Sequence, residues 1–286
     1  MKKYNQAPLP FMGQKRRFVS KFRELLKHYP DNLTIVDLFG GSGLLSRVAK
    51  DEKPLATVVY NDFDNYRKRL GCISQTNALI TEIREFTKDC PPDKKLPDEI
   101  REAIVKRLEQ EEASAGYVDY ITLSSSLLFS GNFAKNREEL KKHTFYNRTK
   151  KPNYNSEGYL DGLKVVSMDY RELFECYKDD PNVLFLLDPP YLDTDAGHYN
   201  MECWRLSDYL DILKLLVGRN YIYFTSDKSG IIELCEWVGQ FCKERKPFGN
   251  MQKKYLKTTM NYNASYNDIM LFTPPPILIF INNKSL

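Results

Sequence analysis

One stretch of the chain sets a carboxylate, two prolines and an aromatic ring directly after a run of apolar residues. The apolar run 184–187 leads into Asp188, Pro189, Pro190 and Tyr191. The proline rings fix φ and stop the strand, which makes the loop rigid. The carboxylate and the Pro189 carbonyl oxygen are then two acceptors beside an aromatic face. This combination suits a flat ring that bears an amino group, held by hydrogen bonds to the NH₂ and by stacking.

A second stretch, VDLFGGSGLLS at 36–46, places three glycines between an apolar run and an expected helix. The apolar run ends on Asp37, and Gly40, Gly41 and Gly43 follow. Glycine lets the backbone turn sharply and approach a ligand closely. The spacing differs from the G-x-G-x-x-G of dinucleotide sites, which argues against that class of ligand. Taken alone, such a turn is also typical of an ordinary strand–helix connection.

Acidic residues end two further apolar runs. Asp62 lies 19 positions after Gly43, at the strand end where α/β nucleotide sites hold ribose hydroxyls. Asp169 follows the run that begins at Leu163, and its carboxylate suits the exocyclic amino group of a bound adenine. Strand-end aspartates are also common in turns and as helix N-caps, so the residues alone leave both interpretations open.

These candidate residues need a sheet to bring them together. Apolar runs rich in Val, Ile, Phe and Leu predict buried strands at 34–39, 56–60, 163–167, 182–187, 221–226 and 268–272. Helical spacing of apolar residues predicts helices over 14–28 and 207–217. The alternation of strands and helices predicts an α/β sheet, in which ligands bind at the carboxyl ends of the parallel strands.

The middle of the chain has a different pattern. Residues 70–162 contain helical patterns and lack a clear buried strand, which predicts an insertion into the α/β domain. Within it, segment 133–160 carries seven basic and three acidic residues, a net charge of +4, with interleaved aromatic and amide side chains. Basic residues bind phosphates, and amides and guanidiniums read base edges. The alternative for such a charge run is a solvated surface.

Composition excludes several classes of protein. The 286 residues have a net charge of +4, 42% apolar residues, six cysteines and three histidines. A zinc site is not expected, because no C-x-x-C pair is present and histidines are few. No signal peptide and no run of about 20 apolar residues is visible, which predicts a cytoplasmic protein that does not enter membranes.

Five motifs in order carry a resemblance to a known family. FMGQK (11–15), DLFGGSG (37–43), NDFD (61–64), MDY (168–170) and DPPY (188–191) resemble those of the Dam-type N6-adenine DNA methyltransferases. The resemblance extends from about residue 8 to 273. It implies an α/β fold with a doubly wound, Rossmann-like methyltransferase sheet and an inserted, mainly helical target-recognition domain. The domains expected are 1–69 with 163–286 for catalysis, and 70–162 for DNA binding.

The resemblance also implies the cofactor and the site residues. The cofactor is S-adenosyl-L-methionine, which leaves as S-adenosyl-L-homocysteine, and no metal is expected. The cofactor-binding residues expected are Phe11, Lys15, Asp37, Phe39, Gly40, Gly41, Gly43, Asp62 and Asp169. Among these, the glycines would cradle the methionine part, Asp62 would hold the ribose and Asp169 the adenine. Gly13-Gln14 stands where the family often has two small residues, with Lys15 kept.

The remaining expectations concern catalysis and DNA. The catalytic residues expected are Asp188, Pro189, Pro190 and Tyr191, and the basic segment adds Arg137, Lys141, Lys142, Arg148 and Lys150 as DNA contacts. Asp188 and the Pro189 carbonyl would orient the adenine amino group and stabilise its developing positive charge. The loop 193–204, with Tyr199, is expected to close over an extruded base. The apolar tail 277–281 is expected to pack on the sheet or on a partner.

Three rival interpretations and several open questions accompany this prediction. The rivals are an RNA methyltransferase, a protein-amide methyltransferase and a DNA-binding regulator without catalysis. Related sites for RNA and protein amides more often begin with Asn, so Asp188 favours DNA adenine. Double-stranded DNA is the expected partner. The sequence does not decide the recognition site, a cognate restriction endonuclease as a second partner, or the oligomeric state.

Overall fold

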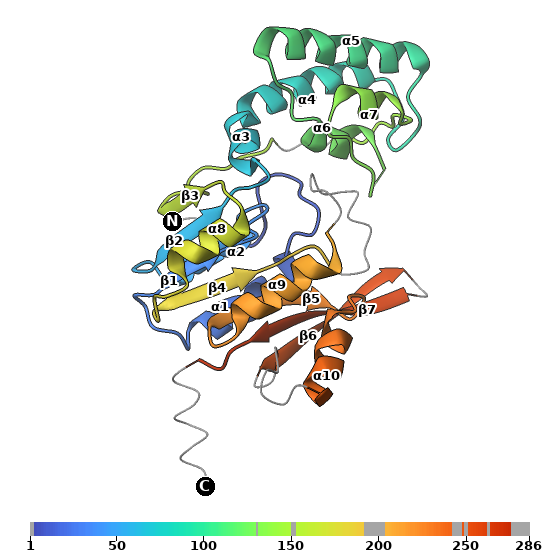
Figure 1. Cartoon of the computed structure of the whole chain (residues 1–286). Helices are drawn as coiled ribbons and strands as arrows, with labels where there is room; N and C mark the ends of the chain where they lie inside the picture. The colour runs from blue at the N-terminus through green and yellow to red at the C-terminus, as the bar shows by residue number, and fades with distance from the viewer. Residues whose placement is uncertain are drawn as a thin grey trace. The chain divides into compact units, whose positions relative to one another are not determined.

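The computed structural model describes residues 3–129, 131–149, 153–191, 204–241, 248, 251–261 and 264–275. The chain divides into two compact units (Figure 1). The first consists of Met1–Gln6, Gly13–Asp64 and Leu160–Leu286, and the second of Ala7–Met12 and Asn65–Tyr159. Each unit has its own buried core.

The first unit is built on a seven-stranded sheet with the order β3-β2-β1-β4-β5-β7-β6. The strands are β1 Thr34–Asp37, β2 Thr57–Asn61, β3 Leu163–Val166, β4 Val183–Leu187, β5 Asn220–Ser226, β6 Gln252–Asn261 and β7 Ala264–Phe272. Strands β1 to β5 are parallel, and β7 is antiparallel to both β5 and β6. The chain winds outward in both directions from β1 and β4, which confirms the predicted doubly wound, Rossmann-like α/β sheet.

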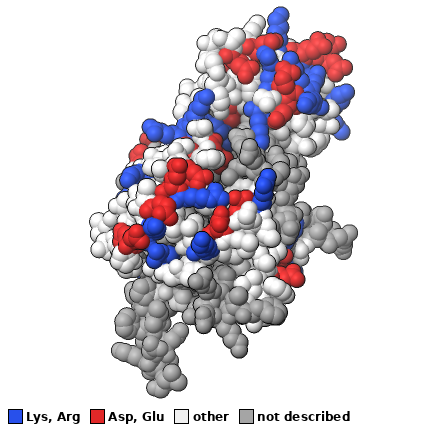
Figure 2. All heavy atoms as spheres, in the orientation of Figure 1, with Lys and Arg blue, Asp and Glu red and all other residues white. Residues whose placement is uncertain are grey.

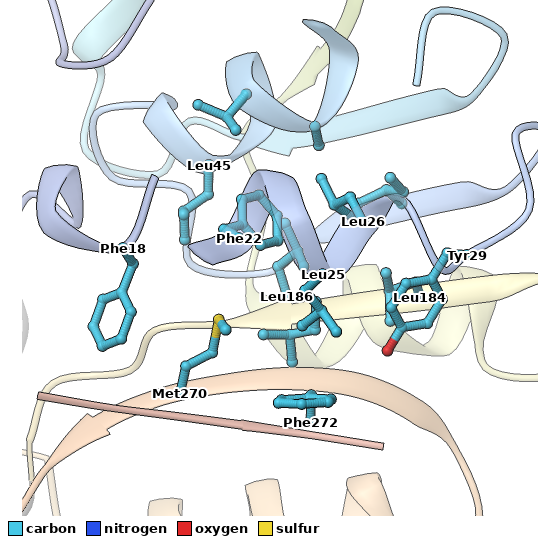
Figure 3. Close-up of a cluster of buried hydrophobic side chains, with 14 of the residues drawn as sticks. Phe18, Phe22, Leu25, Leu26, Tyr29, Leu45, Leu184, Leu186, Met270 and Phe272 are labelled. Atoms are coloured by element: carbon cyan, nitrogen blue, oxygen red, sulfur yellow. The ribbon is translucent and has the colours of Figure 1, made fainter. Parts of the chain in front are cut away.

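Alternate residues of the strands face two helical layers. Ile35, Leu184 and Leu186 pack on one face of the sheet with helices α1 Val19–Leu26 and α2 Leu44–Glu52. Figure 3 shows this layer, in which Leu25 and Leu26 of α1 belong to one cluster with Leu184 and Leu186 of β4. The opposite face packs against α8 Tyr170–Tyr177 and α9 Leu206–Leu216, and α10 Ile231–Phe241 packs next to α9. Both faces are covered, which explains why the strands are continuous apolar runs.

Strand β6 is absent from the sequence prediction, and β7 is longer than predicted. The β6 sequence QKKYLKTTMN is polar and carries three lysines. It lies at the edge of the sheet, where one side of the strand has no neighbouring strand and lysines are tolerated. Lys21 Nζ donates a hydrogen bond to the Tyr255 carbonyl at 2.8 Å, which occupies an acceptor of this edge strand.

The second unit is helical. A short α3, Tyr66–Gly71, leads into α4 Ile73–Thr87, and α5 Asp98–Ala115, α6 Tyr120–Leu127 and α7 Arg137–Lys141 follow. Residues 7–12 belong to this unit: the Leu9 N–H donates to Tyr66 Oη at 2.9 Å. A buried ion pair between Arg69 and Asp119 joins α3 to the start of α6. Within the described part of the chain, no helix combines the length and apolar character needed to cross a bilayer.

Candidate active site

The candidate site lies where the winding direction of the sheet changes. Asp37 ends β1, and Asp188 follows the last residue of β4, the neighbouring parallel strand. The Leu38 N–H donates to the Leu186 carbonyl at 3.1 Å, so the two strands stay paired up to this edge. Helix α2, which follows β1, and helix α9, which follows β4, pack on opposite faces of the sheet. A crevice at such a switch point is the usual ligand site of open α/β sheets.

The glycine turn after β1 needs glycine for steric reasons. A Cβ atom at Gly40 would lie 2.4 Å from the ring of Tyr60. Gly43 has φ +71°, in the left-handed region, and its N–H donates to the Gly40 carbonyl at 2.7 Å. Helix α2 begins at the next residue without a side-chain cap. The first N–H groups of this helix, together with a turn whose glycines carry no side chains, suit a ligand that bears a carboxylate.

Tyr60 is a site residue that the sequence interpretation missed. Its ring is fully buried against the glycine turn. Its hydroxyl lies 2.7 Å from the Gly41 carbonyl oxygen and 3.0 Å from Asp62 Oδ1. Asp62 is itself buried, and its N–H donates to the Val166 carbonyl of β3 at 2.7 Å. Tyr60 therefore connects the glycine turn with the carboxylate expected to hold a ribose.

Asn61 is a second residue that the sequence interpretation missed. Its amide nitrogen donates to the carbonyls of Leu38 and Met168, both at 3.0 Å, and its oxygen accepts from the Met168 N–H at 3.1 Å. The buried side chain thus ties the loop after β1 to the loop after β3. The sequence does show a polar residue, Asn61, between an apolar run and Asp62. It does not show the partner, because Met168 lies 107 positions away.

Asp169 is the N-cap of α8. Its carboxylate accepts a hydrogen bond from the Arg171 N–H at 2.7 Å, and its side chain is 46% exposed. The cap is one of the two roles that the residue type left open. Behind it, Phe39 lies 4.9 Å from Tyr170 and 5.7 Å from Trp204, measured between ring centroids, and forms an aromatic cluster beside the site.

Lys15, Asp188 and Tyr191 come together at the end of β4. Lys15 Nζ lies 2.6 Å from Asp188 Oδ2 and 5.3 Å from the centroid of the Tyr191 ring, and it donates to the Gly13 carbonyl at 2.9 Å. Burial raises the pKa of Asp188, and the Lys15 ammonium opposes this increase. The Lys15 ammonium therefore lies beside the Asp188 carboxylate and the Tyr191 ring, two of the groups that were predicted to bind an amino-bearing ring. Pro189 and Pro190 are buried next to it.

Asp37 is more deeply buried than Asp62, Asp169 and Asp188, the other acids that follow strands. Its Oδ2 accepts a hydrogen bond from Ser46 Oγ of α2 at 2.7 Å, and its Oδ1 has no hydrogen-bond partner among the described residues. Burial, reinforced by the negative charge of Asp188, raises the pKa of Asp37 to about 7. Asp37 can therefore hold a proton near neutral pH.

The basic residues predicted to contact DNA lie in the second unit, and several are paired with acids there. Arg137 forms ion pairs with Glu109 of α5 at 2.7 Å and with Glu112 at 3.8 Å. Lys141 lies 3.6 Å from Glu138. In Figure 2, blue and red side chains alternate on the face of this unit that is in view. The net charge of segment 133–160 therefore overstates the positive charge that this surface presents.

Two further basic residues of the segment differ from Arg137. Arg148 lies 3.1 Å from Asp93 and above the ring of Phe129. Lys142 is exposed, and no ion pair is found for it within the described chain. Phe11 also belongs to the second unit, where its ring lies edge-on to Tyr66. Lys150, residues 193–203 of the predicted loop and the tail 277–281 lie outside the described residues.

Comparisons with known proteins identify the family of the chain. The model of the D12 class N6 adenine-specific DNA methyltransferase family matches residues 11–214, a segment that contains the glycine turn, Asp62, Asp169 and the loop 188–191. A Haemophilus influenzae protein named "Putative methyltransferase" is 37% identical over 284 residues, which cover 95% of this chain and 93% of that protein. The chain therefore belongs to the D12 class N6 adenine-specific DNA methyltransferase family.

Proposed function

We propose that this protein transfers a methyl group from S-adenosyl-L-methionine to N6 of an adenine in double-stranded DNA. The observation that carries the proposal is the position of Asp188 at the switch point, beside Tyr191 and in contact with an ammonium. The family supports methyl transfer to adenine. The cofactor, the duplex substrate and the roles of individual residues are inferred from the family, and the residues at the site fit them.

The residues at the carboxyl edge fit the three parts of the cofactor. The glycine turn and the uncapped start of α2 would hold the methionine carboxylate. Asp62 would accept hydrogen bonds from the ribose hydroxyls. Asp169 lies next to the aromatic cluster of Phe39 and Tyr170, which would contact the adenine ring. When bound, the cofactor supplies an electrophilic methyl group on a sulfonium.

Asp188 would act on the nucleophile. The lone pair of an adenine amino group is delocalised into the ring, so this nitrogen is a weak nucleophile. Hydrogen bonds from the NH₂ to the Asp188 carboxylate and to the Pro189 carbonyl would hold the nitrogen in line with the methyl group and stabilise its developing positive charge. The ring would stack on Tyr191, a contact worth about 1–3 kcal/mol.

Lys15 would compete with the target amino group for Asp188. Its Nζ is only 2.6 Å from Oδ2, so an incoming NH₂ must replace or share this contact. Because burial raises the pKa of Asp188, this carboxylate is also a better acceptor for the proton that the methylated nitrogen must lose. Lys15 would keep the carboxylate ionised until the base arrives.

The second unit would serve as the target-recognition domain. It interrupts the connection between β2 and β3, and it carries the basic and amide-rich segment 133–160. The target adenine must leave the duplex before its N6 can reach Asp188, because this nitrogen is otherwise held in a base pair. A cognate restriction endonuclease would be a second partner. It would cut the same DNA sequence that this protein methylates, and cleavage of methylated and unmethylated DNA tests this.

Transfer of a tritiated methyl group from the cofactor to duplex DNA tests the proposal. Digestion of the product to nucleosides should give labelled N6-methyl-2′-deoxyadenosine, and matched RNA and a protein extract should remain unlabelled. The Asp188→Ala and Asp188→Asn variants should bind the cofactor as the wild type does but transfer methyl groups at least about 100-fold more slowly. Label in RNA or in protein would mean that the substrate is not DNA. The absence of any transfer would favour a DNA-binding regulator.

A further inference from the structure

We propose that the Tyr60 hydroxyl is a positioning group that couples the two halves of the cofactor site, the glycine turn and the Asp62 carboxylate. This inference rests on the proposed function, because it concerns the binding of S-adenosyl-L-methionine. Tyr60 would not touch the cofactor. Its effect would pass through the groups on either side of it.

The ring and the hydroxyl of Tyr60 have separable roles. The ring forms the floor of the glycine turn, since a Cβ atom would lie 2.4 Å from it at Gly40 and 3.1 Å from it at Gly43. A phenylalanine ring would fill the same space. The hydroxyl is the addition that tyrosine brings, and it lies between the Gly41 carbonyl oxygen at 2.7 Å and Asp62 Oδ1 at 3.0 Å.

The coupling arises because the Tyr60 hydroxyl can donate only one hydrogen bond at a time. A tyrosine hydroxyl has one hydrogen, and both of these neighbours are acceptors. Before a ribose binds, the Asp62 carboxylate, which carries the greater charge, competes with Gly41 for that hydrogen. Ribose hydroxyls that donate to Asp62 would satisfy the carboxylate and release the Tyr60 hydrogen to the Gly41 carbonyl.

That transfer would stabilise the turn where the methionine part binds. Gly41 has φ +48°, in the left-handed region, so its carbonyl direction depends on a conformation that a flexible glycine can leave. A full hydrogen bond from the buried Tyr60 hydroxyl would fix this carbonyl and the turn around it. Binding of the ribose would then favour binding of the methionine part at the other end of the cofactor.

Binding measurements on the Tyr60→Phe variant test the coupling. The two probes are S-adenosyl-L-homocysteine, which spans both halves, and adenosine, which lacks the methionine part. Calorimetry should show a Kd for S-adenosyl-L-homocysteine that is about 5–20-fold weaker in the variant, and a Kd for adenosine that changes by less than about 2-fold. In the transfer reaction the KM for the cofactor should rise while kcat stays unchanged.

Tyr29→Phe is the matched control. Tyr29 lies in the same unit, is also buried, and donates its hydroxyl hydrogen to a backbone carbonyl, that of Thr273, at 2.9 Å. Its loss should lower the Tm without changing either Kd. A structural role for the Tyr60 hydroxyl predicts the same behaviour for both variants, and that result would overturn the inference.

Two other outcomes separate this inference from the proposed function. If Tyr60→Phe weakens adenosine and S-adenosyl-L-homocysteine equally, the hydroxyl acts through Asp62 alone and the coupling is wrong. If the wild type binds S-adenosyl-L-homocysteine but methylates no DNA, the proposed function fails, while the Tyr60 measurements still decide the coupling. A wild type that binds neither probe would overturn both.

Discussion

The charged side chains at the carboxyl edge of the sheet are much less exposed than those in the basic segment of the helical unit. At the edge, Asp37 and Asp62 are 1% and 4% exposed, and the side chain of Asp188 is 18% exposed. In the helical unit, Arg137 and Lys141 are 29% and 39% exposed in their side chains and lie beside glutamates. Exposed ion pairs contribute about 0–1 kcal/mol, whereas burial of a charge that lacks full compensation costs several times more.

This difference shows which charges are informative. Acids with raised pKa values cluster at functional sites, and burial raises the pKa of both Asp37 and Asp188. Arg137 and Lys141 are already accounted for by their glutamate neighbours. The density of basic residues in the sequence is therefore a weaker sign of a functional site than the aspartates at the strand ends.

The largest effect expected at the buried edge concerns Asp37 and stability. The pKa of this carboxyl is about 7 in the folded protein against an ordinary value of 3.8. The folded state therefore holds the proton more tightly, so the stability that Asp37 contributes is complete below about pH 4 and is lost as the pH rises through 7. Above pH 7 the Asp37→Asn variant should be more stable by up to about 4 kcal/mol.

Denaturant unfolding of both proteins between pH 4 and 8 measures this contribution. The free energy of unfolding should fall less steeply with pH in Asp37→Asn than in the wild type. Equal slopes for the wild type and Asp37→Asn would mean that Asp37 ionises normally, and its buried position would then lose its significance in the comparison.

Asp62 should give the next largest effect. The Asp62→Ala variant removes a buried acceptor expected to bind the ribose, and the Kd for S-adenosyl-L-methionine should increase about 10–100-fold, the equivalent of a charged hydrogen bond. Asp169→Ala should have a smaller effect, because that carboxylate is half exposed and already caps α8. Calorimetry on both variants ranks them, and a larger loss in Asp169→Ala would reverse the assignment of the two acids.

Lys15 offers a pH measurement. In the proposed mechanism methyl transfer needs Asp188 ionised, so the rate should fall as the pH drops below the pKa of that carboxyl. The Lys15 ammonium lowers this pKa, and Lys15→Met should shift the acidic limb of kcat/KM upward by about one pH unit. Lys21→Met is the control, because Lys21 binds a backbone carbonyl of β6. An unmoved limb in Lys15→Met would remove Lys15 from the environment of Asp188.

The smallest expected effect lies in the helical unit. The Lys142→Ala variant should reduce the slope of log Kd for DNA against log salt by about one unit, the value for one phosphate contact. Arg137→Ala should leave the slope nearly unchanged, since Arg137 is bound to Glu109 and Glu112. Fluorescence anisotropy over a range of salt concentrations provides the measurement. If Arg137→Ala reduces the slope as much as Lys142→Ala, the ion pairs open for DNA and the comparison between the two regions breaks down.

The parts of the fold that sequence could predict are those with a local signal. Strands β1, β2 and β4 are continuous apolar runs because both faces of the sheet are covered, and Asp37, Asp62 and Asp188 mark their ends. The order of the family motifs along the chain then indicated a function for the residues at these strand ends. Strand β6 lacked a signal because an edge strand is free to carry lysines.

The parts that sequence could not predict depend on contacts between distant segments. Asn61 holds Met168, and Tyr60 reaches back to Gly41, so neither role can be seen from neighbouring residues. The same holds for charge, because Glu109 lies 28 positions before the Arg137 that it neutralises. Net charge counted along a segment does not include partners that the fold brings from elsewhere.

The position of the helical unit in the chain has a consequence for how this protein could change. Residues 65–159 enter after β2 and leave before β3, the outermost strand on that side of the sheet. The hydrogen-bond and ion-pair partners named above for Asp37, Asp62 and Asp188 all belong to the other unit. Recombination that replaced 65–159, together with the short segment 7–12, would exchange one module and leave the contacts of the other intact. If the helical unit recognises the target DNA, as proposed above, such an exchange would change the DNA sequence that is recognised and would leave the residues proposed for catalysis in place.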